Sequence, residues 1–260
     1  MVMTTTDALF ALGKALNKYE YPVNYLRLLA RHVGFDYLEK ERELESTEDE
    51  TLQTVLGQLQ KDMPVEYIIG FAEFYGREFM VSRDTLIPRP LTESIVETAL
   101  EYIGENSNAQ SYTFVDIGTG TGCVILSVAL EIKERYPAVF SKSTFIGSDI
   151  SNKALEIAKA NAKKLNADFV TFIEQDGIPE IPDSERTIIL SNPPYIPPEE
   201  MIDLPKSVAS FEPYLALSRN DSLIASLRHL PVSFGNKRKK GCVIIEDTEN
   251  GVPFIEKLSF

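Results

Sequence analysis

The chain has 260 residues, of which 43% are hydrophobic and 25% charged, so it can form one large domain, or a large and a small one, and is not largely disordered. The formal net charge of −13 disfavours general nucleic-acid binding, because a negative protein repels phosphate backbones. Two cysteines and two histidines are too few for a disulfide framework or a histidine-rich metal site, so no metal is expected. No apolar run approaches the roughly 20 residues that span a bilayer, and no secretory signal is recognisable, so no membrane association is expected.

Residues 1–65 are predicted to form a small helical domain. Leucines recur at helical spacing from Leu9 to Leu16, and a second such run ends at Val33. Residues 66–87 then switch to aromatic and β-branched side chains interrupted by glycines, a pattern that predicts a short hairpin acting as a linker.

The segment Glu39–Glu50 is strongly acidic. It holds seven acids against Lys40 and Arg42, so it contributes −5 (two minus seven) of the net charge of −13. A solvated helix end is one interpretation of such a run, and a docking surface for a basic partner is the other.

Strands and helices alternate over residues 88–260, which predicts an α/β domain with a mostly parallel sheet and helices on both faces. Apolar runs predict strands at 112–117, 144–149, 169–174, 187–191 and 242–246, and helical patterns lie at 92–103, 123–134 and 153–165.

The glycine-rich segment Gly118-Thr119-Gly120-Thr121-Gly122 follows the first of these strands and opens a helix. Glycines in this place allow a tight turn and let backbone N–H groups approach a ligand closely. Because the same pattern also opens dinucleotide sites, the loop alone leaves a dehydrogenase, or a purely structural turn, as alternatives.

Two acids follow the next two strands. Asp149 ends its strand where an acid usually accepts hydrogen bonds from ribose hydroxyls, in NAD and S-adenosylmethionine sites alike. Asp176 could meet an adenine amino group, or could be a solvated turn or helix-cap aspartate.

The segment Ser191-Asn192-Pro193-Pro194-Tyr195 comes directly after the fourth strand. Two prolines stiffen the loop and hold a main-chain carbonyl outward, while Asn192 adds a side-chain acceptor. Two fixed acceptors suit a planar –NH2 group, and the ring of Tyr195 can stack on a planar amide or base. The segment therefore predicts a site that holds a planar –NH2 group and directs its nitrogen toward an electrophile, in which Asn192, Pro193 and Tyr195 are the catalytic candidates.

Three segments, VDIGTGTG, GSDIS and SNPPYIP, occur in the order typical of class I S-adenosylmethionine-dependent methyltransferases that modify planar nitrogens, and the chain resembles them. With EFYGREFMVSRDTLIPRPLTE upstream and SFEPYLAL downstream, it is similar to the HemK/PrmC family, the peptide chain release factor glutamine N5-methyltransferases.

This resemblance implies a Rossmann-like methyltransferase domain over residues 88–260, preceded by a helical domain that docks the substrate. It implies S-adenosylmethionine as the cofactor, and as the partner a class 1 release factor whose GGQ glutamine is methylated, without direct nucleic-acid binding. The implied cofactor-binding residues are Gly118, Thr119, Gly120, Thr121, Gly122, Asp149, Asp176 and Asn192. The implied substrate-binding residues are Asn192, Pro193, Pro194 and Tyr195, with Pro88 and Arg89 shaping the pocket and Glu212 and Pro213 lining its entrance.

The chain departs from the family pattern at several positions. Leu91 stands where the family has an acid, Gly177 where it often has a bulky residue, and residues 218–223 lack the usual glycine. The family ends in an antiparallel strand pair, whereas residues 252–260 are predicted here to form at most a short helix. The strand at 242–246 is therefore expected at or near a sheet edge, where it could pair with another chain.

Two other functions are compatible with these motifs. One is a methyltransferase that modifies N6 of adenine or another amino group of nucleic acid, against which the negative charge counts. The other is an inactive protein that binds the cofactor or a release factor. The expected location is the cytoplasm, or the mitochondrial matrix if the source is eukaryotic.

Overall fold

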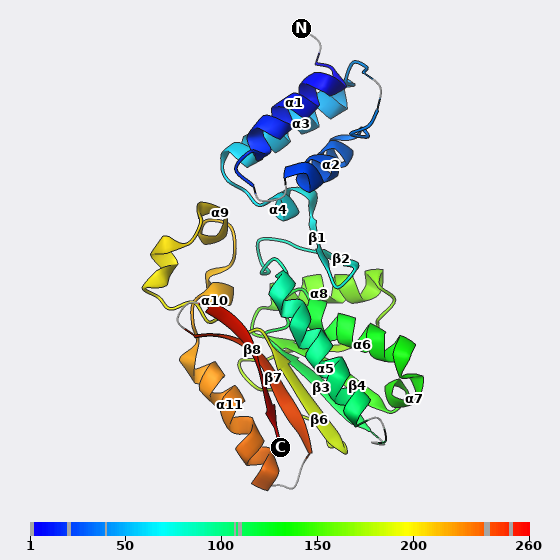
Figure 1. The fold of residues 1–260 in the computed structure, drawn as a ribbon, viewed down its shortest axis with the longest axis vertical. Helices are drawn as coiled ribbons and strands as arrows, with labels where there is room; N and C mark the ends of the chain where they lie inside the picture. Colours follow the sequence, from blue (N-terminus) through cyan, green and yellow to red (C-terminus); the bar gives the residue numbers. More distant parts are fainter. Residues whose placement is uncertain are drawn as a thin grey trace. The chain divides into compact units, whose positions relative to one another are not determined.

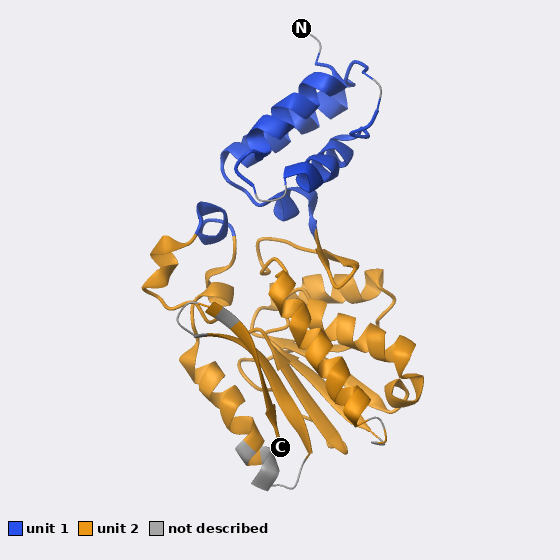
Figure 2. Ribbon diagram, viewed as in Figure 1, with its two compact units in different colours: residues 1–71, 205–211 blue, residues 72–204, 212–260 orange. Residues whose placement is uncertain are grey.

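The computed structural model describes residues 3–19, 22–39, 41–106, 108, 111–236, 240–249 and 252–260. The chain divides into two compact units, residues 1–71 with 205–211 and residues 72–204 with 212–260 (Figure 2). The functional division into residues 1–65, 66–87 and 88–260 stays a prediction.

A six-stranded sheet in the order β5-β4-β3-β6-β7-β8 forms the centre of the second unit (Figure 1). Every neighbouring pair is parallel except β7 and β8. The strands are β3 (Tyr112–Ile117), β4 (Ser143–Asp149), β5 (Thr171–Glu174), β6 (Arg186–Ser191), β7 (Lys240–Glu249) and β8 (Val252–Ser259). The predicted α/β architecture is thus confirmed.

Helices cover both faces of this sheet because its strands are apolar on both sides. Successive side chains of β7 alternate, so that Cys242 and Ile244 join the core under α5 and α6, whereas Val243 and Ile245 join a second core with Leu227 of α11. The unit's helices are η1 (Pro90–Thr92), α5 (Glu93–Glu105), α6 (Cys123–Arg135), α7 (Pro137–Phe140), α8 (Asn152–Lys164), η2 (Glu200–Asp203), α10 (Tyr214–Leu217) and α11 (Asp221–Asn236).

The C-terminal segment differs from the prediction. Residues 252–259 form β8, antiparallel to β7, so the expectation of at most a short helix, with the final strand pair missing, was wrong. The strand at 242–246 lies next to an edge rather than at one, and its outer side is paired with β8 instead of being open to another chain. Ile255 packs on one core while Leu258 and Phe260 pack on the other, a two-residue alternation decided by pairing with the free edge of β7. The turn expected at residues 250–251 lies outside the described residues.

The first unit is a small helical bundle. The two predicted helical runs are confirmed as helices, and a third helix begins at Ser46. Leu12, Leu16 and Leu29 are fully buried in its core, which has no contribution from the core residues of the sheet. Its helices are α1 (Thr5–Leu16), α2 (Pro22–Val33), α3 (Ser46–Gln60), α4 (Val65–Ile69) and α9 (Lys206–Ala209). A hairpin of β1 (Phe71–Phe74) and β2 (Arg77–Met80) follows α4, as expected. Within the described part of the chain, no helix is long and apolar enough to cross a membrane.

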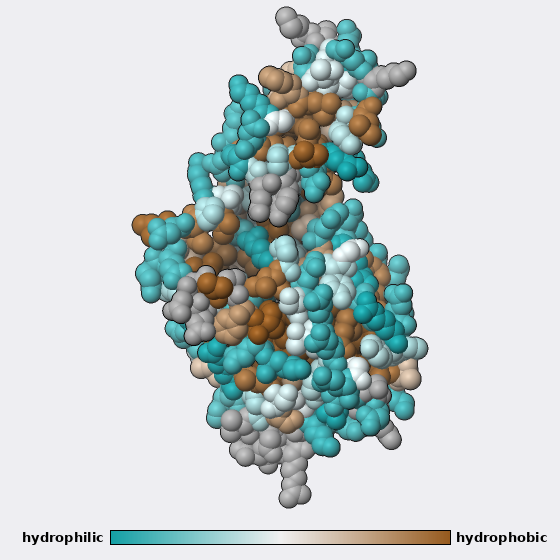
Figure 3. All heavy atoms as spheres, viewed as in Figure 1, coloured by the Kyte–Doolittle hydropathy of each residue, from teal (hydrophilic) through white to brown (hydrophobic). Residues whose placement is uncertain are grey.

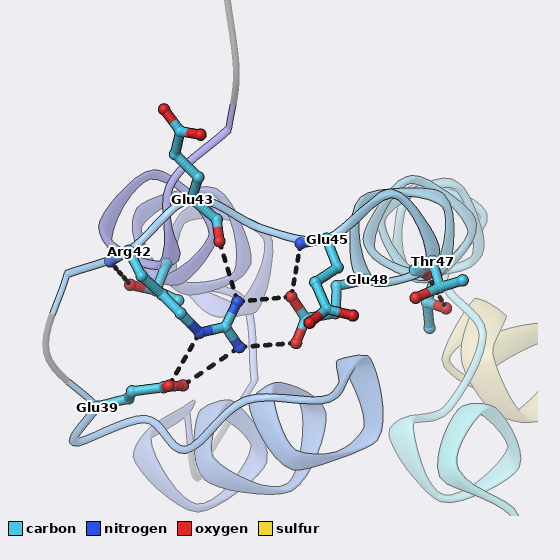
Figure 4. A network of polar contacts seen from close by, with 8 residues as sticks. Glu39, Arg42, Glu43, Glu45, Thr47 and Glu48 are labelled. Atoms are coloured by element: carbon cyan, nitrogen blue, oxygen red, sulfur yellow. Dashed lines mark hydrogen bonds and ion pairs between the residues drawn. The ribbon is translucent and has the colours of Figure 1, made fainter.

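Part of the acidic segment 39–50 is organised around Arg42 rather than simply solvated (Figure 4). Both terminal nitrogens of Arg42 donate to Glu48 at 2.7 Å, and its Nε donates to Glu39 at 2.9 Å. Glu48 also accepts the backbone N–H of Glu45 at 2.8 Å, which caps the start of α3. The Arg42 hydrogen bonds are the main cause that lowers the pKa of Glu48 to about 2.

We expect Glu48→Gln to lower the midpoint of thermal unfolding by several degrees at pH 7, because a bidentate, charge-assisted pair and a helix cap are weakened together. Since the folded-state pKa of Glu48 is depressed, its stabilisation is present above the ordinary value of 4.5 and lost as pH falls toward about 2. The difference between wild type and variant, followed by circular dichroism, should therefore shrink over that range.

Glu43→Gln is the matched control. Its side chain is exposed and only its backbone carbonyl accepts from Arg42, so the midpoint should move by no more than about 1 °C. Equal effects of the two substitutions at pH 7 would show that the Arg42 pairing does not stabilise the bundle.

Candidate functional site

A cavity of about 370 Å³ opens where the parallel strands end, the edge at which α/β sheets bind ligands. The segments after β5, β4, β3 and β6 all contribute to its lining. Among the predicted site residues, those in the lining are Gly118, Thr119, Gly120, Thr121, Asp149, Asp176, Asn192 and Pro194, together with Pro88, Arg89 and Pro213. The structure therefore brings together residues from three separate sequence motifs, whereas the predicted Gly122, Pro193, Tyr195 and Glu212 are not among the residues that line the cavity.

The glycine loop adopts a backbone that other residues rarely accept. Gly118, Gly120 and Gly122 have φ angles of 73°, 54° and 78°. A Cβ atom at Gly118 or Gly120 would meet nothing within 4 Å, whereas at Gly122 it would come within 3.0 Å of Leu126. The first two glycines thus leave open space beside the backbone, and the third leaves room for Leu126 of α6 and Ala158 of α8.

Asp149 ends β4 and holds the glycine loop in place. Its two carboxylate oxygens accept the backbone N–H groups of Gly120 and Ser151, each at 2.9 Å. A carboxylate has about four acceptor positions, so about two remain for a ligand's hydroxyl groups. Burial raises the pKa of Asp149, and the backbone N–H groups of Ser151, Gly120 and Ile150 oppose this by stabilising the charged form.

The loop after β6 is tied to the segment before α11. The carbonyl of Pro194 accepts the N–H of Asn220 at 3.0 Å, and the N–H of Ile196 donates to the carbonyl of Leu217 at 3.1 Å. Asn192 and Pro194 line the cavity, whereas the hydroxyl of Tyr195 donates to Glu246 of β7 at 2.8 Å. Burial, reinforced by Glu246, raises the pKa of Tyr195, so this phenol stays protonated and remains a donor.

An ion pair links the two segments that flank the cavity. Arg89 donates to Glu212 at 2.5 Å, and the second oxygen of Glu212 accepts the N–H of Ile87 at 3.3 Å. Glu212 is almost fully buried, so these partners offset the cost of removing its side chain from water. Arg89 and Pro213 reach the cavity from this pair, consistent with the predicted shaping of the pocket.

Three supporting residues were missed by the sequence analysis. Thr92, which also borders the cavity, accepts from Asn192 and donates to Glu246. The buried side chain of Asn161 bonds both Met80 and the carbonyl of Thr121 in the glycine loop. Glu246 had a usable signal, since it follows four apolar residues at the end of a predicted strand, at the same sheet edge as the other motifs.

The arrangement suits an elongated ligand with a nucleoside at one end. Asp176, Asp149, the glycine loop and Asn192 follow strands that are successive neighbours in the sheet, so the row extends about 14 Å at 4.7–4.9 Å per strand. Carboxylate acceptors lie in the middle of the row, and the stiff loop that begins at Asn192 lies at its end. In the described part of the chain, no cluster of side chains could hold a metal ion.

Comparisons with known proteins agree with this geometry. A family model described as "Methyltransferase domain" matches residues 108–210. The release factor glutamine methyltransferase of Enterococcus faecalis is 34% identical over 221 residues, which cover 84% of this chain and 74% of the relative. That of Flavobacterium psychrophilum is 36% identical over 215 residues, covering 80% and 72%. The crystal structure of the hMettl16 catalytic domain in complex with a MAT2A 3′UTR hairpin is similar in fold, with a TM-score of 0.50 at 16% identity over 90% of this chain and 83% of that one.

Asp116 gives the site a measurable pH dependence. It is almost fully buried below the glycine loop, and burial raises its pKa to about 7 although the hydroxyl of Thr119, at 2.6 Å, favours the charged form. A raised folded-state pKa means that this group's stabilisation is complete below the ordinary value of 3.8 and is lost as pH rises through about 7.

We expect Asp116→Asn to remove the loss of stability that accompanies ionisation of Asp116, because the amide oxygen can still accept from Thr119 but carries no charge. Its free energy of unfolding, measured with urea, should rise relative to wild type between pH 4 and pH 7 by up to a few kcal/mol as an order of magnitude. Asp168→Asn, at an exposed position, is the control and should show no such trend. Parallel pH curves for wild type and Asp116→Asn would refute the assignment.

Proposed function

Because this chain belongs to the release factor glutamine methyltransferase family, we propose that it transfers a methyl group from S-adenosylmethionine to the side-chain nitrogen of the GGQ glutamine of a class 1 peptide chain release factor. One observation carries the proposal: Asn192 and Pro194, in the stiff loop that follows β6, line the same cavity as Asp149 and the glycine loop. An amide-binding element beside a nucleoside-binding element is what methylation of an amide requires.

The cavity residues fit S-adenosylmethionine, which when bound supplies an electrophilic methyl group on a cationic sulfur. The free acceptor positions of Asp149 would take the ribose hydroxyls, and Asp176, beside Gly177, would meet the adenine amino group. The open backbone at Gly118 and Gly120 leaves space for the part of the cofactor that carries the sulfur.

Asn192 and the carbonyl of Pro193 would hold the two N–H groups of the substrate amide. An amide nitrogen is a poor nucleophile because its lone pair is delocalised, and two acceptors in a fixed position favour the orientation in which that pair points into the cavity. Orientation of this kind can supply effective molarities on the order of 10⁵ M. The proton leaves the nitrogen after transfer, since an N-methylated amide cation is strongly acidic.

The surface beside the loop suits a protein substrate. Ile202, Tyr214 and Leu215 are exposed by 87%, 61% and 70%, and apolar surface gathers over the segment between β6 and α11 (Figure 3). Exposed apolar side chains beside a polar site favour contact with protein, whereas the net charge of −13 disfavours a nucleic-acid backbone.

Mass spectrometry tests the proposal directly. The purified protein is incubated with S-adenosylmethionine and a class 1 release factor, and the GGQ peptide should gain one methyl group on its glutamine. A release factor with that glutamine replaced by alanine, and equal amounts of DNA and tRNA, are the controls. Methyl incorporation into nucleic acid, with none in the release factor, would favour the alternative function.

We expect Asn192→Ala to lower kcat about 100- to 1000-fold, by analogy with the removal of one positioned donor from an oxyanion hole. Binding of S-adenosylmethionine, measured by calorimetry, should stay within about threefold, because the cofactor's main contacts lie on other strands. Asn152→Ala, the same change at an exposed position on α8, is the control. A kcat within threefold of wild type for Asn192→Ala would remove the role assigned to it.

We expect Asp149→Ala to weaken S-adenosylmethionine binding about 10- to 100-fold, because hydrogen bonds to a charged acceptor contribute roughly 1.5–3 kcal/mol. At saturating cofactor the rate should change far less. Asp149→Asn keeps one acceptor oxygen for the loop or the ligand, so its affinity for S-adenosylmethionine should lie between those of wild type and Asp149→Ala. Unchanged affinity in Asp149→Ala would show that this carboxylate does not bind the ribose.

A further inference from the structure

Two buried side chains, Thr92 and Glu246, connect Asn192 to Tyr195 through hydrogen bonds. The Nδ2 atom of Asn192 lies 3.0 Å from the hydroxyl oxygen of Thr92, and that hydroxyl donates to Glu246 at 2.7 Å. The other oxygen of Glu246 accepts the hydroxyl of Tyr195 at 2.8 Å. Thr92 and Glu246 are 3% and 1% exposed, so water does not replace these partners. The carboxylate of Glu246 on β7 thereby links η1 to the loop that follows β6.

The available donors and acceptors in this series of hydrogen bonds determine which end of the Asn192 amide faces Thr92. A carboxylate only accepts, so the single proton of the Thr92 hydroxyl is committed to Glu246. Toward Asn192 the hydroxyl oxygen can then only accept, which requires the –NH2 end of the amide to face it. The carbonyl end, Oδ1, is left for the other side.

We propose that Glu246 is a positioning residue for the methyl transfer. Through Thr92 it holds the amide of Asn192 with Oδ1 available to the substrate nitrogen, and through Tyr195 it holds the other end of the same loop. The proposal rests on the proposed function, in which that oxygen accepts an N–H of the substrate amide. If the Asn192 amide were flipped, its –NH2 group would face the –NH2 group of the substrate amide. One of the two acceptors for the substrate would then be lost.

Glu246→Gln separates this role from simple packing. Glutamine has nearly the same shape but one acceptor oxygen and one –NH2 group, so it cannot accept from both hydroxyls. When its –NH2 donates to Thr92, the hydroxyl proton turns toward Asn192 and the flipped amide becomes the better partner. Thr92→Val removes the relay at a second point and does not alter Glu246, while Thr92→Ser retains the hydroxyl.

The experiment compares kcat, the KM for release factor, cofactor affinity and thermal unfolding in these variants. Glu246→Gln and Thr92→Val should each lower kcat by about tenfold or more, with cofactor Kd within about twofold and Thr92→Ser within about threefold of wild-type kcat. The double variant should lose little more than the worse single one, because both changes break the same relay. Unchanged kcat in Thr92→Val, or a loss in Thr92→Ser as large as in Thr92→Val, would overturn the proposal.

A spectroscopic signature decides the matter without the reaction. The side-chain –NH2 resonances of Asn192, assigned in ¹⁵N-labelled protein by their loss in Asn192→Ala, should include one hydrogen-bonded, slowly exchanging proton. That signal should move and exchange faster in Thr92→Val but not in Thr92→Ser. If it is identical in all three proteins, Thr92 does not hold the amide. If instead wild type fails to methylate release factor while this signature appears, the proposed function fails and the positioning of Asn192 stands.

Discussion

Parallel strands of a sheet all end at the same edge. Asp149 at the end of β4, the glycine loop after β3 and Asn192 after β6 therefore lie within two strand spacings of one another. Every other feature of the site depends on this pairing. The register of β3 with both neighbours, Asp116 beside Gly147 and Leu190, brings the three strands to this edge almost level. A slip of one residue in β6 would turn Asn192 to the opposite face of the sheet, where α11 packs.

The edge also concentrates carboxylates, and each one is given partners. Asp149 accepts two backbone N–H groups, Asp116 accepts from Thr119, and Glu246 accepts two hydroxyls. Buried acids without such partners would be costly. Asp149 borders the cavity, so the proposed cofactor would gain an attraction through its sulfonium charge that the product, which lacks this charge, would not.

Contacts far apart in the sequence stiffen the site from outside. Asn161 on α8 bonds the backbone of β2 and of the glycine loop, and the pair of Arg89 with Glu212 joins segments more than a hundred residues apart. These contacts explain why the upstream IPRP segment and the downstream SFEPYLAL segment accompany the methyltransferase motifs. The two segments supply two parts of the cavity lining, and the ion pair between Arg89 and Glu212 joins them.

The sequence by itself determined the elements and most of the cavity residues. Apolar runs, helical spacing and glycines report local backbone preference, so the strand after Ser111, the glycine loop and the rigid Asn192 loop were all predictable, as was their meeting at one sheet edge. Tertiary structure alone decided what lies behind them. Residues 252–259 became a strand only because β7 offered a free edge, and the partners of Thr92 are 100 and 154 positions away in the sequence. Local propensity carries no information about such partners, because a buried hydroxyl or carboxylate is satisfied by whatever the fold brings within hydrogen-bonding distance.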